Sequence, residues 1–404
     1  MKNIIIAAVC GTILLTACDE KAINIIQEKE LELNQNDRAL ITAMNQFTVK
    51  LFDEVKNAED ENKNLLLSPY SAHVALSLIA NGAEGDTQQA MTQTLGYAGW
   101  PMQDVNASQQ KLIEGLPLVS LKNELSIANS MWINDGFQIV PDFLNTSDEY
   151  YLARASAIPF VNPQAAQTIN SWVKEQTKGK IEDIIEEVNA DDLLYVLNAI
   201  YFKGVWADKF KAELTKAEDF VKADGSLVRA DFMRNTTDYK VFSVQGVDAV
   251  EIPYADDKFS MVLVRNNADE WNNDIDLRSI MEQSANNKRK IELILPKFTF
   301  SFERVLNNDL TNLGMGLVFD DGADFSKIIA DKPAKISIVK QKAFIEVNEE
   351  GTEAAAVTSV GMQVTSAPII PTMKFDRPFL FFIKENSSGL ILFIGLVNDP
   401  TEQG

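Results

Sequence analysis

The sequence predicts an α+β protein in which helices pack on a large β-sheet. Helix-like patterns dominate the first half of the chain, and strand-like runs dominate the second half. The two kinds of segment do not alternate regularly, as they would in a protein built from βαβ units. With 404 residues, 46% of them hydrophobic, the chain can bury one large core or two modest ones.

The chain begins with the pattern of an export signal. Lys2 supplies a positive start, and residues 4–17 are almost wholly apolar. This run is too short to cross a bilayer, which takes about 20 residues, so residues 1–17 are typical of a signal peptide. The run ends in Leu15-Thr16-Ala17-Cys18, which resembles the lipobox of bacterial lipoproteins.

The lipobox resemblance implies cleavage before Cys18 and attachment of lipid to its thiol. The protein would then be exported and anchored to a bacterial membrane by that lipid, on the periplasmic side or at the cell surface. Residues 18–35 would form a polar spacer between the anchor and the body. An ordinary secretory signal with a chance cysteine is the alternative.

Charge and cysteine content limit the partners and the means of stabilisation. A formal net charge of -21 disfavours nucleic acid, and we find no Lys/Arg cluster that marks a docking face for a sulfated polysaccharide. The two cysteines, Cys10 and Cys18, both lie at the N-terminus. The body must therefore fold without a disulfide of its own.

The body is expected to be one domain, residues 36–404, that begins with helices. Apolar residues recur at helical spacing from Leu40 to Val55, and Asp37 can cap this helix. His73, the single histidine, is expected to be a packed residue of the next helix. Further helices are expected at residues 71–81, 86–95 and 165–177.

Strand-like runs follow later in the chain. Their residues are 193–199, 259–264, 291–295 and 343–347. The chain closes with two apolar runs, 379–383 and 390–394, around a polar turn, which predicts a buried hairpin.

A long segment of small side chains, about residues 349–374, lies between the strand-like run that ends at Val347 and the final hairpin. A loop of this length inside a compact domain is usually functional. Its sequence from Glu349 to Ala356, together with Phe375-Asp-Arg-Pro-Phe379, resembles the hinge and the downstream signature of inhibitory serpins. The resemblance continues in the family's order over nearly all of the body, at residues 64–71, 169–181, 197–206, 295–297 and 313–315.

The serpin resemblance implies a fold in which helices pack on a large central sheet, with further sheets and an exposed reactive loop. It implies a monomer without cofactor or metal that inhibits proteases, either serine proteases or papain-like cysteine proteases. The target attacks the loop and forms its acyl-enzyme, and the cut loop enters the main sheet before the acyl-enzyme is hydrolysed. The implied hinge residues are Glu350, Gly351, Thr352, Glu353, Ala354, Ala355 and Ala356.

The composition of the hinge suits insertion as a strand. Counting by two from Thr352 to Thr358 gives only small side chains for the inner face, and the other face is expected to meet solvent. No proline interrupts residues 351–363, and Gly351 supplies a pivot. Roughly 12 inserted residues at about 1 kcal/mol per net hydrogen bond give about 10 kcal/mol, which is comparable to the stability of a domain.

The bond that the protease cuts is expected to join Thr365 and Ser366, by counting from Gly351 as in antitrypsin-like relatives. Counting back from Phe375 gives Ala367–Pro368 instead, a poor substrate because proline follows the bond. No Lys or Arg occurs between Val347 and Met373, which argues against trypsin-like targets. The small and aliphatic neighbours favour elastase-like or subtilisin-like proteases.

The resemblance also assigns a polar cluster where the sheet opens, and the place where the loop enters. Ser68, Ser71 and Asn198 belong to the cluster, and Trp206 lies at the entry. In the family a histidine commonly joins the cluster, but here Gln341 takes the aligned position. A glutamine amide both donates and accepts hydrogen bonds but does not titrate.

Two other classes of protein remain to be weighed. Ser171 and Lys174 fit a Ser-x-x-Lys pattern, but no Lys-Thr-Gly partner exists, and His73 has no nucleophile elbow beside it. An enzyme is therefore not expected. A serpin that binds or chaperones a ligand without inhibiting proteases is the stronger rival, and the small residues of the hinge argue against it.

Overall fold

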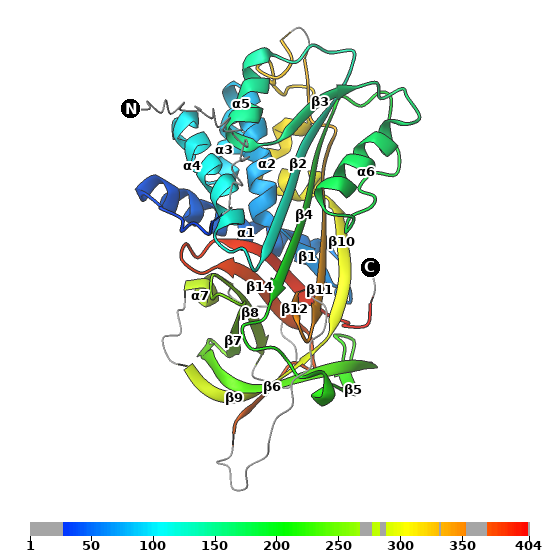
Figure 1. The fold of residues 1–404 in the computed structure, drawn as a ribbon. Helices are drawn as coiled ribbons and strands as arrows, with labels where there is room; N and C mark the ends of the chain where they lie inside the picture. Colours follow the sequence, from blue (N-terminus) through cyan, green and yellow to red (C-terminus); the bar gives the residue numbers. More distant parts are fainter. Residues whose placement is uncertain (1–26, 267–276, 283–287, 331–332, 353–369, 403–404) are drawn as a thin grey trace, which may run out of the picture.

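The computed structural model describes residues 27–266, 277–282, 288–330, 333–352 and 370–402 (Figure 1). It confirms the α+β class, because helices pack on two large mixed sheets. One sheet has nine strands in the order β1-β15-β14-β8-β7-β6-β9-β13, with β5 paired to β6. The other has six strands in the order β10-β11-β12-β4-β2-β3.

The six-stranded sheet contains the strands that matter most for function. They are β2 (Glu124–Asn134), β3 (Arg154–Ile158), β4 (Leu194–Val205), β10 (Phe298–Val305), β11 (Ile338–Asn348) and β12 (Gly351–Thr352). Buried and half-buried residues alternate strictly along β11, so each of its two faces packs against a different layer.

The nine-stranded sheet holds the expected apolar hairpin. Its strands are β1 (Leu65–Leu67), β5 (Lys216–Val221), β6 (Leu227–Val244), β7 (Val247–Pro253), β8 (Phe259–Asn266), β9 (Lys288–Pro296), β13 (Thr372–Lys374), β14 (Phe379–Glu385) and β15 (Ile391–Val397). The hairpin is β14–β15, with β8 and β1 paired to its edges, and its residues are buried on both faces of the sheet. Near-continuous apolar sequence is what such doubly covered strands require.

The described helices are α1 (Gln35–Ala58), α2 (Pro69–Gly82), α3 (Gly85–Thr94), α4 (Met102–Gly115), α5 (Pro141–Tyr151), α6 (Ala165–Gln176), α7 (Leu277–Glu282) and α8 (Asn307–Leu310). α2 and α6 cover opposite faces of the six-stranded sheet, whereas α7 lies beside the nine-stranded sheet (Figure 1). Leu194, Val196 and Ile200 of β4 face the main core that contains α2. Tyr195 and Leu197 face a second core under α6, on the opposite side of the sheet (Figure 1).

The start of α1 differs slightly from the expectation. Asn34 rather than Asp37 is the N-cap, and the two residues form a reciprocal capping box. Asp37 is buried and also accepts hydrogen bonds from Ser108 and Lys111 of α4. The carboxylate therefore joins two helices rather than closing one.

His73 is confirmed as a packed helix residue. It is fully buried, its Nε2 lies 3.0 Å from the carbonyl oxygen of Leu95, and its Nδ1 lies 3.3 Å from both Ser77 Oγ and Gln109 Nε2. Burial lowers the pKa of His73 to about 4, although the bond to Leu95 acts in the opposite direction. The imidazole is therefore neutral at physiological pH.

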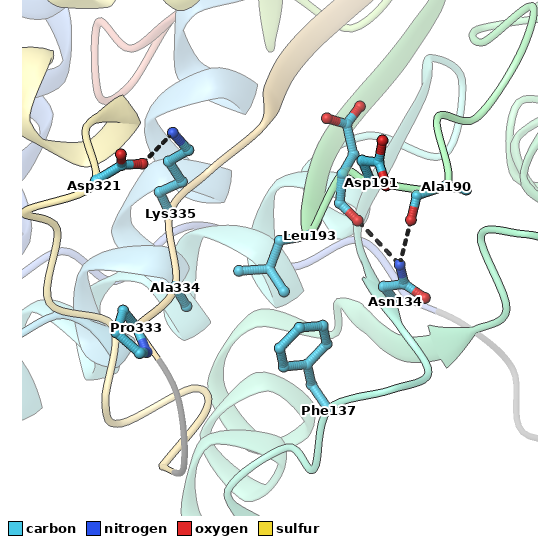
Figure 2. Close-up of a pocket in the computed structure, with 10 residues that line it drawn as sticks. Asn134, Phe137, Ala190, Asp191, Leu193, Asp321, Pro333, Ala334 and Lys335 are labelled. Carbon is cyan, nitrogen blue, oxygen red and sulfur yellow. Dashed lines mark hydrogen bonds and ion pairs between the residues drawn. The ribbon is translucent and has the colours of Figure 1, made fainter.

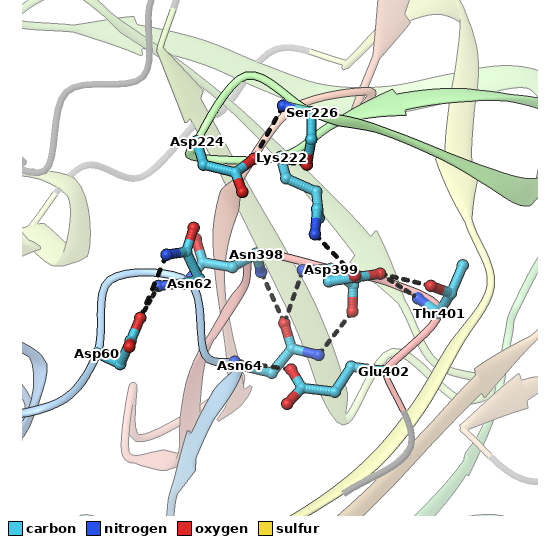
Figure 3. Close-up of polar contacts among 10 residues, drawn as sticks. All are labelled: Asp60, Asn62, Asn64, Lys222, Asp224, Ser226, Asn398, Asp399, Thr401 and Glu402. Carbon is cyan, nitrogen blue, oxygen red and sulfur yellow. Dashed lines mark hydrogen bonds and ion pairs between the residues drawn. The ribbon is translucent and has the colours of Figure 1, made fainter.

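Both ends of the described chain are fastened to the body. Residues 27–34, the last part of the expected spacer, lie against the segment after α4, where the backbone N–H of Lys29 donates to the carbonyl of Leu118 at 2.8 Å. Figure 3 shows the other end, where the Asn64 side chain binds the backbone of Asn398 and Asp399 at 2.7–2.9 Å. Among the described helices, none is long and apolar enough to span a membrane.

Candidate functional site

The candidate site is a seam between β4 and β11 in the six-stranded sheet. These two strands pair directly and in parallel over Tyr195–Tyr201 and Ile338–Phe344. Beyond Tyr201 and Phe344 the pairing stops, and β12 lies between the two strands. Gly351 and Thr352 are paired antiparallel with both neighbours at once. The seam is therefore already open at one end, and the first hinge residues occupy the opening.

Thr352 is held in the opening by a buried hydrogen bond. Its side chain points into the core, the residue is 1% exposed, and its Oγ1 lies 2.8 Å from the hydroxyl of Tyr254. The Tyr254 ring stacks on Trp206, with centroids 4.6 Å apart and planes 10° apart. Trp206 Nε1 donates to the Asn348 carbonyl oxygen at 3.0 Å. The expected entry residue Trp206 thus supports the hinge, together with a partner, Tyr254, that the sequence did not indicate.

Gly351 is required by close backbone contact. A Cβ at this position would lie 2.0 Å from the carbonyl oxygen of Gly204, and the φ angle of +153° also disfavours residues with side chains. Gly204 has a similar constraint, because a Cβ there would lie 2.5 Å from the Tyr254 ring. Gly351 is therefore glycine because the β4 backbone lies so close, and Gly204 because the Tyr254 ring packs against it.

Two glutamates fix the chain just before β12, and the second of them, Glu350, is the first of the implied hinge residues. Glu349 forms an ion pair with Lys297 at 3.1 Å and accepts a hydrogen bond from Thr215 at 2.8 Å, and Glu350 forms an ion pair with Lys209. Burial alone would raise the pKa of Glu349, but hydrogen bonds from its own backbone, Thr215 and Lys297 outweigh this, and the pKa is lowered. The glutamate is therefore charged at neutral pH and remains paired with Lys297.

A buried polar network crosses the closed part of the seam. Asn129, Asn198 and Gln341 lie in one row across β2, β4 and β11. Gln341 Nε2 donates to Asn198 Oδ1 at 2.6 Å, and Asn198 Nδ2 donates to Asn129 Oδ1 at 2.5 Å and to Ser71 Oγ. The Ser68 amide donates to Gln341 Oε1 at 2.9 Å, and Gln341 Nε2 donates to the Ser68 carbonyl at 2.9 Å.

The structure thus brings together Ser68, Ser71, Asn198 and Gln341, and adds Asn129. All five residues are buried, with exposures of 0–6%. Separating β4 from β11 breaks the bond between Asn198 and Gln341, so the network holds the seam closed. The only sequence signal for Asn129 is an asparagine inside an apolar strand pattern.

A pocket lies at the far end of the seam, where β4 and β11 begin (Figure 2). Its volume is about 620 Å³. Phe137, Leu193 and Ala334 give it an apolar surface. Charged and polar groups surround this surface, including the ion pair between Lys335 and Asp321 at 2.5 Å.

The predicted loop, residues 349–374, differs from the expectation at both ends. Gly351 and Thr352 form β12 and are buried, and Thr372–Lys374 form β13, which pairs in parallel with β9. Backbone groups at both ends are thus used in sheets, which limits the exposed loop to the positions between them. Glu353, Ala354, Ala355, Ala356, Thr365 and Ser366, and the expected lipidation residue Cys18, lie outside the described residues.

The loop residues whose outer face was expected to meet solvent, 353–359, lie outside the described residues. The outer face of the seam itself is covered along its middle, because Tyr195, Leu197 and Ala199 pack under α6. One further expectation is wrong. A cluster of basic residues also exists. Lys288, Arg289 and Lys290, which we call the basic strip, form the exposed start of β9. The strip is easily missed in a chain with a net charge of -21.

The comparisons with known proteins agree with this geometry. The sequence model of the family described as "Serpin (serine protease inhibitor)" matches residues 42–400. An uncharacterized serpin-like protein of Methanosarcina acetivorans is 32% identical over 373 residues, covering 89% of this chain and 86% of that protein. The leukocyte elastase inhibitor of Xenopus tropicalis is 32% identical over 378 residues, covering 89% of this chain and 99% of that protein. The structure of human thyroxine-binding globulin aligns with a TM-score of 0.81 at 27% identity, covering 91% of this chain and all of that one.

Proposed function

The chain belongs to the serpin family, and on that premise we propose that it is an inhibitor that traps proteases by inserting its cut reactive loop between β4 and β11. The observation that carries the proposal is β12, in which two hinge residues, Gly351 and Thr352, already lie between these strands. The residues that follow Thr352 are the part of this chain that would extend β12 along the seam as an added strand.

The pairing of β12 fixes the register in which the rest of the loop would enter. Each residue further along the loop lies opposite residues one position earlier on both β4 and β11. Thr358 would therefore enter between Asn198 and Gln341, at the polar network. Thr365 would lie opposite Asp191 and Ala334, both of which line the pocket at the far end. The seam and pocket together match the distance from the hinge to the proposed scissile bond.

Insertion would replace the hydrogen-bond ladder between β4 and β11 by two ladders, one on each side of the new strand. The seven direct pairs between β4 and β11 would be replaced by antiparallel pairing on both sides of the new strand. The Thr358 hydroxyl can donate and accept, so it can take over hydrogen bonds that Asn198 and Gln341 lose. The inner-face residues from Thr352 to Thr358 are small enough to enter without displacing the core.

The reaction that follows uses only the catalytic groups of the target. A serine protease, elastase-like or subtilisin-like, attacks the carbonyl carbon of Thr365 and forms an acyl-enzyme, and the chain from Ser366 onward leaves as the new N-terminus. Insertion then carries the attached protease to the far end of the seam, about 40 Å from Thr352 at about 3.3 Å per residue. Distortion of the protease there removes the donors and the base that deacylation needs.

The proposal is tested by incubation with a panel of serine and papain-like cysteine proteases, followed by denaturing electrophoresis. We expect a stable covalent complex with an elastase-like or subtilisin-like enzyme, and none with trypsin. Mass spectrometry of the released fragment is expected to find Ser366 at its N-terminus. If every protease that cuts the loop releases a nicked protein without a complex, the chain is not an inhibitor.

A non-inhibitory binding role is the second candidate, because the family includes thyroxine-binding globulin, whose fold this chain shares. The pairing of Gly351 and Thr352 on both sides weighs against it, since a hinge that never enters the sheet does not need a prepared opening.

We also propose that Cys18 carries lipid and that residues 1–17 are removed. The nine residues from Cys18 to the described body span at most about 30 Å, so the body would lie close to the membrane surface. Cys18→Ser is expected to release the protein from the membrane fraction of a bacterial host. Unchanged membrane association would contradict the anchor.

A further inference from the structure

The basic strip, Lys288–Lys290, lies next to the exit of the reactive loop. β9 pairs in parallel with β13, with Glu292 opposite Thr372, and the Glu292 amide donates to the Pro371 carbonyl at 2.9 Å. The strip precedes Glu292 on β9, just as the end of the loop precedes Thr372 on β13. The strip therefore lies at the same end of this strand pair as Ile370 and Pro371, the last described residues before β13.

The three cations are not used within the described part of the protein. All three residues are exposed, and none of them forms an ion pair with a described residue. Their cross-strand neighbours on β6 are Lys240, Tyr239 and Asp238. Lys240 is itself committed to Glu251 at 2.7 Å, which leaves Asp238 as the facing acidic group.

This is unusual for a molecule with a net charge of -21. Most basic side chains elsewhere on the six- and nine-stranded sheets lie within 4 Å of a carboxylate, as Lys340, Arg234 and Lys374 do. Lys288 and Lys290 lie on one face of β9 and Arg289 on the other. Three adjacent cations without an ion pair to a described residue raise the local positive potential and repel one another, so their placement favours an anionic partner.

We propose that the basic strip is a docking surface for an acidic patch beside the substrate cleft of the target protease. The inference rests on the proposed function, because a protease that binds the loop must cover the edge where the loop ends. A partner protein can present two or three carboxylates to a strip of this length. A long polyanion would extend beyond it onto Asp238, Glu292 and the acidic remainder of the surface.

Exposed charges at the rim of an interface act mainly on association. They raise the rate of encounter and make it sensitive to salt, and they contribute little to events after the loop is cut. Removal of the strip is therefore expected to slow association with a protease whose cleft is bordered by acidic residues by about threefold to tenfold at low salt. The number of inhibitor molecules used per trapped protease is expected to stay the same, because loop insertion does not involve β9.

The test compares the full-length protein with two triple variants of equal charge. Lys288→Ala/Arg289→Ala/Lys290→Ala removes the strip, and Arg38→Ala/Lys50→Ala/Lys122→Ala removes three exposed cations outside it. Second-order rate constants for association are measured at salt concentrations from about 0.05 to about 0.5 M NaCl. Exposed charges are weakly screened at the lower concentration and strongly screened at the higher one, because the Debye length shortens as salt is added. Two elastase-like proteases are used, one with an acidic and one with a neutral rim around the cleft.

The proposal is supported if the association rate constant and its salt dependence fall in the strip variant but not in the other triple variant, and if they fall only with the protease that has an acidic rim. Equal losses in both variants would overturn it, since they would report net charge alone. Unchanged rates for the strip variant would also overturn it, and binding of dextran sulfate that the strip variant loses would then assign the strip to a polyanion.

The same rates remain measurable if trapping fails. Docking precedes cleavage. The rate at which the protease with the acidic rim cuts the loop is therefore expected to depend on the strip even when no covalent complex forms. Nicking without complexes, at a rate that still depends on the strip, would reject the inhibitory function and keep the docking surface. Covalent complexes that form at a rate independent of the strip would support the inhibitory function and reject the docking surface.

Discussion

In the proposed mechanism, the side chain of Thr352 affects whether the protein traps the protease or is released as a cleaved substrate. Its hydroxyl binds Tyr254 beneath the sheet, and the residue is 1% exposed. After cleavage, the remaining loop can enter only behind a residue that stays in this position. The size and polarity of residue 352 therefore govern the start of insertion.

Thr352→Arg is expected to convert the inhibitor into a substrate. An arginine cannot be accommodated between Gly204 and Val347 without burying an unpaired charge, which costs several kcal/mol. Insertion would slow at least about tenfold, so that the acyl-enzyme is hydrolysed first. The ratio of nicked inhibitor to covalent complex, read from a gel, measures this. Thr352→Ser keeps the hydroxyl and serves as the control. Normal trapping by the arginine variant would exclude insertion at this seam.

His73 offers a second prediction at a single residue, because it is the only histidine in the chain. Its pKa falls from 6.5 to about 4 on folding, owing to burial, so the unfolded chain binds a proton more readily between these values. The contribution of the neutral imidazole is complete above about pH 6.5 and is lost as the pH falls toward 4. The whole effect is on the order of 3 kcal/mol.

The measurement is the free energy of unfolding between pH 7.5 and 4.5, for the natural protein and for His73→Gln. The natural protein is expected to lose stability as the pH falls through 6.5, and the variant is expected to show a flatter curve over the same range. Below about pH 4.5 carboxylates titrate in both proteins. Parallel curves between pH 6.5 and 4.5 would mean that His73 does not cause the slope.

At the scale of elements, α6 limits what the loop can carry on its outer face. The proposed register places Gly361 between Tyr195 and Ile338, both of which pack in the core under α6. A large side chain there would have to lift α6 or strain the strand. This constraint is independent of the small inner-face residues that the sequence suggested.

Gly361→Leu is therefore expected to leave cleavage of the loop unchanged but to reduce trapping. Overpacking of about 1–3 kcal/mol would slow insertion by about tenfold. Gln363→Leu is the matched control, since residue 363 lies on the same face but opposite Leu193, which lines the open pocket. Burst kinetics with a susceptible protease would separate cleavage from trapping. Equal trapping by both variants would contradict the proposed register.

The sequence indicated the main elements and most of the polar network, for different reasons. The hairpin β14–β15 could be predicted from local apolar pattern, and Ser68, Ser71, Asn198 and Gln341 from aligned motifs. Asn129 and Tyr254 could not, because their roles arise only when strands distant in sequence come into register. The packing of α6 over the seam likewise depends on tertiary structure, and it could not be predicted from the hydrophobic periodicity of any one segment.

At the scale of the whole molecule, the six-stranded sheet has two halves that meet along the seam. β2, β3 and β4 pair with one another on one side, and β10 and β11 pair on the other. The contacts across the seam include the seven pairs of β4 with β11, the bond between Asn198 and Gln341, and the hydrogen bonds of Ser337 with Leu193 and Leu194 at 3.0 Å. A closed seam of this length is a weaker arrangement than a sheet with an additional central strand.

Nicking of the loop is therefore expected to stabilise the protein. If about 10 kcal/mol is gained when the strand enters, the melting temperature of a body of this size should rise by about 10–15 °C. Calorimetry before and after limited cleavage by an elastase-like protease measures the change. The nicked Thr352→Arg variant provides the control, because its loop is cut but is expected to remain outside the sheet, so its transition should move little. A nicked natural protein that melts at the same temperature as the intact one would instead indicate a fixed loop, as a non-inhibitory binding protein would have.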